Sequence, residues 1–178
     1  EAELIFSTHI AEYLNNTKPY LYIDVGGGST ELTLFFKNSK IADASFNIGS
    51  IRVMEHRDPK VIWEKMKQWI KKNTVAYTGI IGIGTGGNMN RLYKLSNIKN
   101  NKPISYQKLK HLSDYLKSFD YQELVDKVGL NPDRADVIIP AAKIYLRAME
   151  WANIQQMYVP DRGLIDGMMH YLHERKAS

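Results

Sequence analysis

The chain has 178 residues and no cysteine, and its 24 Lys and Arg against 19 Asp and Glu give a formal charge of +5. With a hydrophobic content of 44%, this predicts one globular domain and excludes a disordered or low-complexity chain. Zero cysteines exclude a disulfide scaffold, a zinc finger, an iron–sulfur site and a thiol nucleophile, and they suit a reducing, cytoplasmic compartment.

The sequence also indicates which classes of binding partner to expect. No apolar run approaches the roughly 18 residues of a membrane span, so we expect no membrane contact. No basic run with interleaved aromatic residues is present, so we expect no nucleic-acid partner. The surplus of positive charge instead favours ligands that carry phosphate.

The expected elements begin with an apolar helical face over residues 4–14. Alternating residues over 20–25, 30–36 and 41–46 predict an antiparallel meander of three strands. A helix over residues 59–73, with Asp58 as N-cap, then leads to a short apolar strand that suits a buried parallel position. That strand covers residues 78–83, and further helices are expected over 89–95, 105–116, 121–128, 137–151 and 164–172, with a strand over 156–159.

This order of elements predicts an α/β fold. We expect a mixed sheet that contains the antiparallel three-strand meander and carries helices on both faces. No internal repeat or linker divides the chain, so residues 1–178 are expected to form a single domain.

The most informative segment is DVGGGSTE at residues 24–31, between two predicted strands. Asp24 ends one strand and Glu31 begins the next, so both carboxylates come to the same end of a hairpin, where they can share Mg²⁺. Glycines without side chains allow backbone N–H groups to approach a phosphate closely. The predicted phosphate-binding residues here are Gly26, Gly27, Gly28 and Ser29. A plain glycine-rich turn with two surface acids is the alternative.

A second glycine segment, GIGTGGN at residues 82–88, lies between a predicted strand and a helix. Free N–H groups and the positive end of the helix dipole there favour an anion. The segment has neither the Lys of a P-loop nor the acidic residue of a dinucleotide site. Its predicted phosphate-binding residues are Gly84, Gly86, Gly87 and Asn88.

Residues 24–31 resemble the Asp-Ile-Gly-Gly-Gly-Ser-Thr-Glu signature of the exopolyphosphatase and guanosine pentaphosphate phosphohydrolase family. EAELI at residues 1–5 is similar to that family's Glu-Ala-x-Leu-Ile helix start, residues 84–88 to its second phosphate loop, and RADVI at residues 134–138 to a further helix entry. The family is a branch of the actin-like, sugar-kinase and heat-shock ATPase superfamily. The resemblance therefore implies a ribonuclease H-like (actin-like ATPase) domain.

The resemblance also implies an activity, namely Mg²⁺-dependent hydrolysis of the terminal phosphate of inorganic polyphosphate or guanosine pentaphosphate. By this match Glu1 is the catalytic base that activates water, while Asp24 and Glu31 hold the metal. A phosphate-binding sensor without turnover and an ATP-dependent kinase of the same superfamily are the alternatives.

The family's first domain, with its own phosphate loop, has no counterpart in the sequence. We therefore expect the C-terminal half of a two-domain phosphatase, with the missing N-terminal domain as its partner. The family's Arg-Glu-Gly element is replaced by Ile165-Asp166-Gly167, which leaves open the roles of Arg162 and Asp166. A site completed by a second copy of the chain, as a homodimer, is the alternative.

Overall fold

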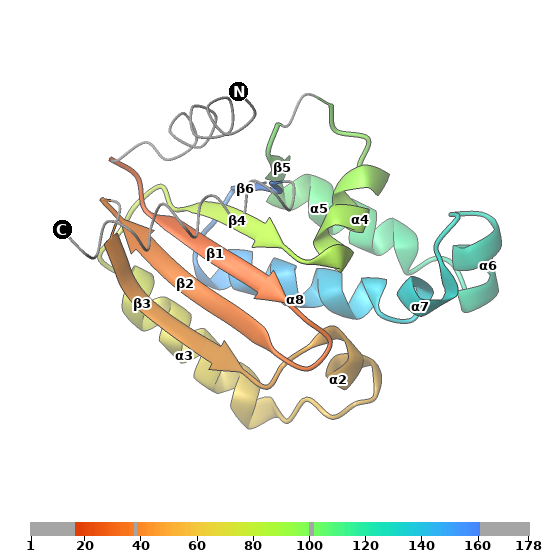
Figure 1. The fold of residues 1–178 in the computed structure, drawn as a ribbon, viewed down its shortest axis with the longest axis horizontal. Coiled ribbons are helices and arrows are strands. Elements are labelled where there is room, and N and C mark those ends of the chain that lie inside the picture. The colour runs from red at the N-terminus through yellow and green to blue at the C-terminus, as the bar shows by residue number, and fades with distance from the viewer. Residues whose placement is uncertain (1–16, 38, 100–101, 161–178) are drawn as a thin grey trace, which may run out of the picture.

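The computed structural model describes residues 17–37, 39–99 and 102–160. Within them, a six-stranded mixed sheet runs in the order β3-β2-β1-β4-β6-β5 (Figure 1). The strands are β1 (Tyr20–Val25), β2 (Thr30–Phe36), β3 (Ser39–Phe46), β4 (Ile81–Thr85), β5 (Ile104–Ser105) and β6 (Gln156–Tyr158). The helices are α2 (Ser50–Met54), α3 (Lys60–Thr74), α4 (Gly87–Leu95), α5 (Tyr106–Leu116), α6 (Tyr121–Asp126), α7 (Pro132–Ala135) and α8 (Ile138–Trp151). The expected α/β class is confirmed.

The meander forms as predicted. β1 pairs with β2 and β2 with β3, both antiparallel. Leu21, Ile23 and Val25 of β1 are buried, whereas Tyr22 and Asp24 between them are only partly buried. Because successive side chains of a strand point to opposite faces, one face of the meander is core and the other carries the polar residues.

The second half of the sheet is built around β4. This strand lies parallel to β1 and to β6, as expected for a strand reached by a crossover helix, and β5 adds an antiparallel edge. An added Cβ at Gly82 or Gly84 would lie 3.1 Å or 2.7 Å from the Met157 side chain. Both glycines therefore make room for Met157 against the sheet.

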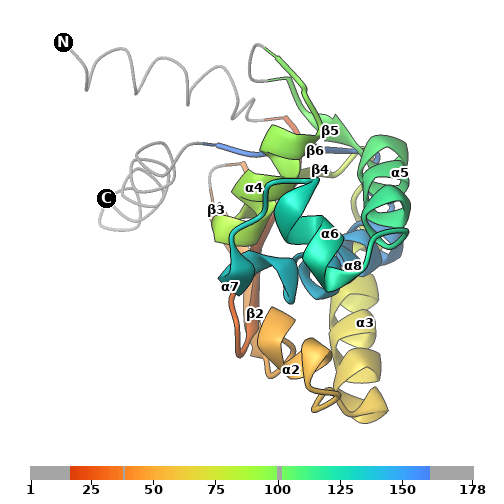
Figure 2. The same ribbon diagram turned by 90° about the vertical axis from the view of Figure 1, so that its right-hand side faces the viewer.

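The helices α3, α5 and α8 cover the apolar face of the sheet (Figure 2). α8 lies against β1 at the centre, and its buried residues are Ile138, Ala141, Ala142, Ile144, Tyr145, Ala148 and Met149. The predicted helices over residues 4–14 and 164–172 lie outside the described residues. Among the described residues, no helix combines the length and apolar character that a membrane span requires.

Local differences from the sequence prediction have simple causes. The N-cap of α3 is Pro59, and Asp58 instead accepts a hydrogen bond from Trp63 Nε1 at 2.9 Å. β4 begins at Ile81, three residues later than expected, because Gly79 has a φ of 65° and so is not in an extended conformation. Ser105 caps α5 as predicted, through Lys108 N at 3.1 Å. The short elements α2, α7 and β5 were not predicted.

Candidate phosphate-binding and metal site

The two acids of the first glycine segment lie side by side. Asp24 at the carboxyl end of β1 is the direct partner of Glu31 in β2. Directly opposed residues of an antiparallel pair extend to the same face, with Cβ atoms about 4.5–5.5 Å apart. Asp24 is partly buried and Glu31 is exposed. The register thus brings both carboxylates to one place at the end of the hairpin.

The first glycine turn, residues 26–29, is fastened to α2 through its carbonyl groups. Gly26 O accepts hydrogen bonds from Ser50 N at 2.9 Å, and Gly27 O accepts from Ile51 N at 3.0 Å. Gly28 O accepts from Arg52 Nε at 2.9 Å. Because the carbonyls turn toward α2, the N–H groups of the turn are directed elsewhere, and those of residues 27–29 have no protein partner within the described part of the chain.

The second glycine segment forms the start of α4. Gly86 has a φ of 98°, which favours glycine, and it precedes the helix as a cap without a side chain. The first N–H groups of an α-helix have no intrahelical partner. The segment therefore presents uncapped N–H groups at Gly87 and Asn88, together with the positive end of the α4 dipole.

The two glycine segments meet at Asp24. β1 and β4 are neighbours, and Asp24 pairs with Thr85 in the parallel register, so both segments leave the sheet at the same edge (Figure 1). The position that a Cβ of Gly86 would take lies 3.1 Å from Asp24 Oδ1. The absence of a side chain at Gly86 is what admits the Asp24 carboxylate against the second segment.

A hydrogen-bonded chain of polar groups links the two segments. Asn88 Nδ2 donates to Ser50 Oγ at 3.3 Å, and the Ser50 hydroxyl donates to Gly26 O at 3.4 Å. Arg134 Nη1 donates to Asn88 Oδ1 at 2.9 Å. Asn88 and Ser50 are both buried, so this network is sheltered from water.

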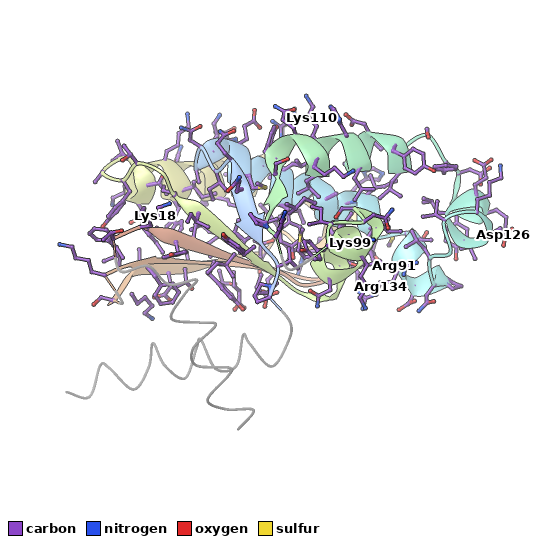
Figure 3. All side chains as sticks on the ribbon, turned by 90° about the horizontal axis from the view of Figure 1, so that it is seen from above. Lys18, Arg91, Lys99, Lys110, Asp126 and Arg134 are labelled. Atoms are coloured by element: carbon purple, nitrogen blue, oxygen red, sulfur yellow. The ribbon has the colours of Figure 1, made fainter. Side chains whose placement is uncertain are left out.

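The Arg134 side chain also packs against Gly87 of the second segment, and it lines a cavity with basic residues. Its guanidinium nitrogens lie 2.7 and 2.8 Å from the position of a Cβ at Gly87. Beside it is a cavity of about 190 Å³, and Figure 3 shows Arg91 and Arg134 close together there. The lining residues are Gly87, Asn90, Arg91, Lys94, Asn131 and Arg134. Three cations and two amides make this cavity suited to anions.

Tyr145 of α8 packs beneath the sheet at the point where the two glycine segments begin. It is fully buried in α8, and its hydroxyl donates to the Thr85 carbonyl. Burial raises the pKa of Tyr145 well above its usual value, and the negative charge of Asp24 raises it further. The hydroxyl therefore keeps its proton and remains a donor.

The donor set fits Mg²⁺. This ion is usually held by one or two carboxylates plus water and phosphate oxygens, and Asp24 and Glu31 supply two carboxylates beside two glycine segments. Among the described residues, no group of three or more His, Asp or Glu side chains is gathered in one place.

The structure thus brings together most of the residues chosen from sequence. Asp24, Glu31 and both glycine segments converge, whereas Gly84 lies two residues before Gly86, within β4 and beneath Met157. The predicted base Glu1, and also Arg162 and Asp166, lie outside the described residues. Sequence reasoning missed Ser50, Arg134 and Tyr145, although RADVI at residues 134–138 had singled out the segment that begins with Arg134.

Fold and site define an α/β domain of the actin-like ATPase type, with two glycine segments and a carboxylate pair at one edge of the sheet. The Aquifex aeolicus Ppx/GppA phosphatase has a similar fold, with a TM-score of 0.70 and 23% identity over 90% of this chain and 59% of that one. The profile of the Ppx/GppA phosphatase family matches residues 1–175. The chain belongs to that family.

Two curated relatives carry more specific names. Exopolyphosphatase 2 of Mycobacterium tuberculosis is 37% identical over 67 residues, which cover 36% of this chain and 21% of that protein. The guanosine-5'-triphosphate,3'-diphosphate pyrophosphatase of Vibrio parahaemolyticus is 26% identical over 163 residues, which cover 84% of this chain and 33% of that protein. The chain therefore spans a third or less of the curated relatives that it matches.

Proposed function

We propose that this protein hydrolyses the terminal phosphate of inorganic polyphosphate or guanosine pentaphosphate with the help of Mg²⁺. The observation that carries the proposal is the Asp24 carboxylate, which stands between Glu31 and Gly86 at the meeting point of the two glycine segments. Family membership and the names of the two curated relatives support the same chemistry.

The described residues can supply both metal binding and phosphate binding. Asp24 and Glu31 would hold Mg²⁺, which when bound neutralises charge on phosphate oxygens. Backbone N–H groups of residues 27–29 and 87–88 and the Arg134 guanidinium would bind the phosphates. Positioning and charge stabilisation are most of what phosphoryl transfer requires of a protein.

The reaction needs one base, and the resemblance of residues 1–5 to the family's helix start supports Glu1 in that role. The water oxygen forms a new bond to the terminal phosphorus while Glu1 takes a water proton. The bridging P–O bond breaks, and its electron pair leaves with the shortened chain. The products are orthophosphate and a chain shorter by one phosphate.

The test is Glu1→Gln in the full-length protein, with Glu3→Gln as a control of equal charge change two residues away. We expect Glu1→Gln to bind tripolyphosphate almost as the wild type does and to lose about a hundredfold or more in turnover, the usual scale for a general base. Unchanged turnover would remove Glu1 from this role. Binding by the wild type without any turnover would favour a sensor, and phosphate transfer from ATP to an acceptor would favour a kinase.

We propose further that these 178 residues are the C-terminal half of a two-domain phosphatase. Half a cleft cannot align a phosphate chain from both sides, and alignment can contribute roughly 7–11 kcal/mol to lowering a barrier. The 178-residue chain should therefore fold but hydrolyse polyphosphate poorly beside a longer protein that includes the upstream domain. Equal specific activity would contradict this proposal and would favour a homodimer that completes the site.

A further inference from the structure

The strands β1 and β4 separate at one point, and Tyr145 lies beneath it. The last pair in the parallel register is Asp24 with Thr85. Beyond it, β1 continues into residues 26–29 and β4 into residues 86–88, so the ladder ends where the two glycine segments begin. Beyond the last ladder pair, the spacing between the two glycine segments must be set by contacts other than the β1–β4 hydrogen bonds.

The Tyr145 hydroxyl occupies this junction. The position of a Cβ on Gly86 lies 3.3 Å from Tyr145 Oη, 3.1 Å from Asp24 Oδ1 and 3.1 Å from Val25 O. The hydroxyl donates to the Thr85 carbonyl; burial raises the pKa of Tyr145, the nearby Asp24 charge raises it further, and a hydrogen bond with the Val25 backbone lowers it. One side chain from α8 thus bonds to the end of β4 and lies beside the end of β1.

We infer that Tyr145 is a positioning residue, whose hydroxyl sets the spacing between the Asp24 carboxylate and the second glycine segment. Its role is to let a metal at Asp24 and a phosphate at residues 86–88 bind at the same time. This inference rests on the proposed function, since it assumes that both ligands share the site. It adds a role for a core residue that touches neither ligand.

The inference predicts a specific defect. Asp24 and Glu31 belong to the β1–β2 hairpin, which does not depend on Tyr145 for its pairing. The N–H groups of the second segment belong to α4. Removing the hydroxyl should therefore leave each ligand able to bind alone and should weaken the cooperation between them, which is a coupling free energy between two sites.

The experiment measures that coupling by calorimetry on the full-length protein. Methylenediphosphonate, a phosphate-chain analogue with a P–C–P bridge that is not cleaved, is titrated with and without Mg²⁺, with correction for the complex that the two form in solution. The variant is Tyr145→Phe. Its matched control is Tyr93→Phe, which removes another hydroxyl that donates to a backbone carbonyl, that of Lys102 at 2.7 Å, away from the junction.

In the wild type and in Tyr93→Phe, Mg²⁺ should tighten diphosphonate binding by about tenfold or more, within the usual range for coupled sites. In Tyr145→Phe this factor should fall about fivefold or more, while the dissociation constant without Mg²⁺ changes less than twofold. A Tyr145→Phe protein that keeps the wild-type factor would overturn the inference, and so would an equal loss in Tyr93→Phe. Absence of coupling in the wild type would overturn the proposed function itself.

A second variant guards against a Tyr145→Phe protein that does not fold. Gly86→Ala keeps Tyr145 and places a methyl group between its hydroxyl and Asp24 Oδ1. If the spacing at this junction sets the coupling, Gly86→Ala should lower the same factor, again by about fivefold or more. Retention of the wild-type factor in a folded Gly86→Ala protein would count against the inference.

Discussion

The two glycine segments lie at the same edge of the sheet but are held in different ways. Residues 26–29 are held mainly through their own carbonyl groups, which accept from the backbone N–H groups of Ser50 and Ile51 and also from the nearby Arg52 side chain. Residues 86–88 and the end of β4 before them are held by side chains from far along the sequence, since Arg134 donates to Asn88 and Tyr145 donates to the carbonyl of Thr85.

The two segments should therefore respond differently to substitution. The first segment depends on the absence of side chains at and around it, so added atoms should harm it by disturbing the fold. The second depends on specific polar groups, so lost atoms should harm it by weakening ligand binding. Substitution of Asp24 or Glu31 at the junction should lower the rate of hydrolysis without disturbing the fold.

The largest effect is expected at the junction. Asp24→Asn should lower Mg²⁺-dependent hydrolysis by the full-length protein by about a thousandfold, because one of two metal ligands loses its charge. Circular dichroism should show an intact fold, since Asp24 is not part of the apolar core. Asp43→Asn, in β3 of the same sheet and paired with Lys40 at 2.8 Å, is the control. Equal losses in both variants would contradict a role for Asp24 in metal binding.

The next effect tests the backbone packing of the first segment. An added Cβ at Gly49 would lie 2.2 Å from Gly27 O, so Gly49→Ala should lower the free energy of unfolding by about 3 kcal/mol, at the upper end for overpacking. Gly79→Ala is the comparison, since Gly79 has a φ of 65° and open space around it. Its cost should be only about 1–2 kcal/mol, from φ alone. Urea unfolding that ranks Gly79→Ala as the more damaging change would contradict this account.

The third effect tests the side chains of the second segment. Arg134→Gln should weaken tripolyphosphate binding by about tenfold or more, the scale of a hydrogen bond to a charged group. Arg147→Gln removes the same charge from an exposed pair with Glu150 at 2.9 Å on α8 and should leave binding unchanged. If the two variants weaken binding equally, net charge rather than the position of Arg134 is responsible.

The smallest effect tests the link between the segments. Ser50→Ala removes the hydroxyl between Gly26 O and Asn88 Nδ2 and should cost about 1 kcal/mol of stability, the usual value for a hydrogen bond. Because the link joins both segments, tripolyphosphate binding should also weaken by a few-fold. Ser96→Ala, which removes a buried hydroxyl that donates to Tyr93 O at 2.7 Å, should cost similar stability without weakening binding. Unchanged binding in Ser50→Ala would mean that the two segments act independently.

The contrast between the segments also explains what the sequence could reveal. Strand alternation and the three glycines predicted the hairpin, and the meeting of Asp24 and Glu31 followed from their places at the end of one strand and the start of the next. These features depend on neighbours along the chain. The α/β class followed in the same way, from the order of periodic segments.

What sequence reasoning missed depends on contacts between distant residues. Arg134 is 46 residues from Asn88, and Tyr145 is 60 residues from Thr85. Tyr145 lies on the apolar stripe of α8, where a tyrosine looks like any other core residue. α2 is only five residues long, too short to produce a periodic signal. Only the folded chain shows that these groups meet at the site.

We expect one metal and one phosphate chain to share the junction of the two segments. A crystal structure of the full-length protein with Mn²⁺, which gives an anomalous signal, and methylenediphosphonate tests this most directly. We expect an anomalous peak between the Asp24 and Glu31 carboxylates, with a phosphonate group bound by the N–H groups of Gly87 and Asn88. A metal bound elsewhere, or an ordered diphosphonate that touches neither glycine segment, would contradict it.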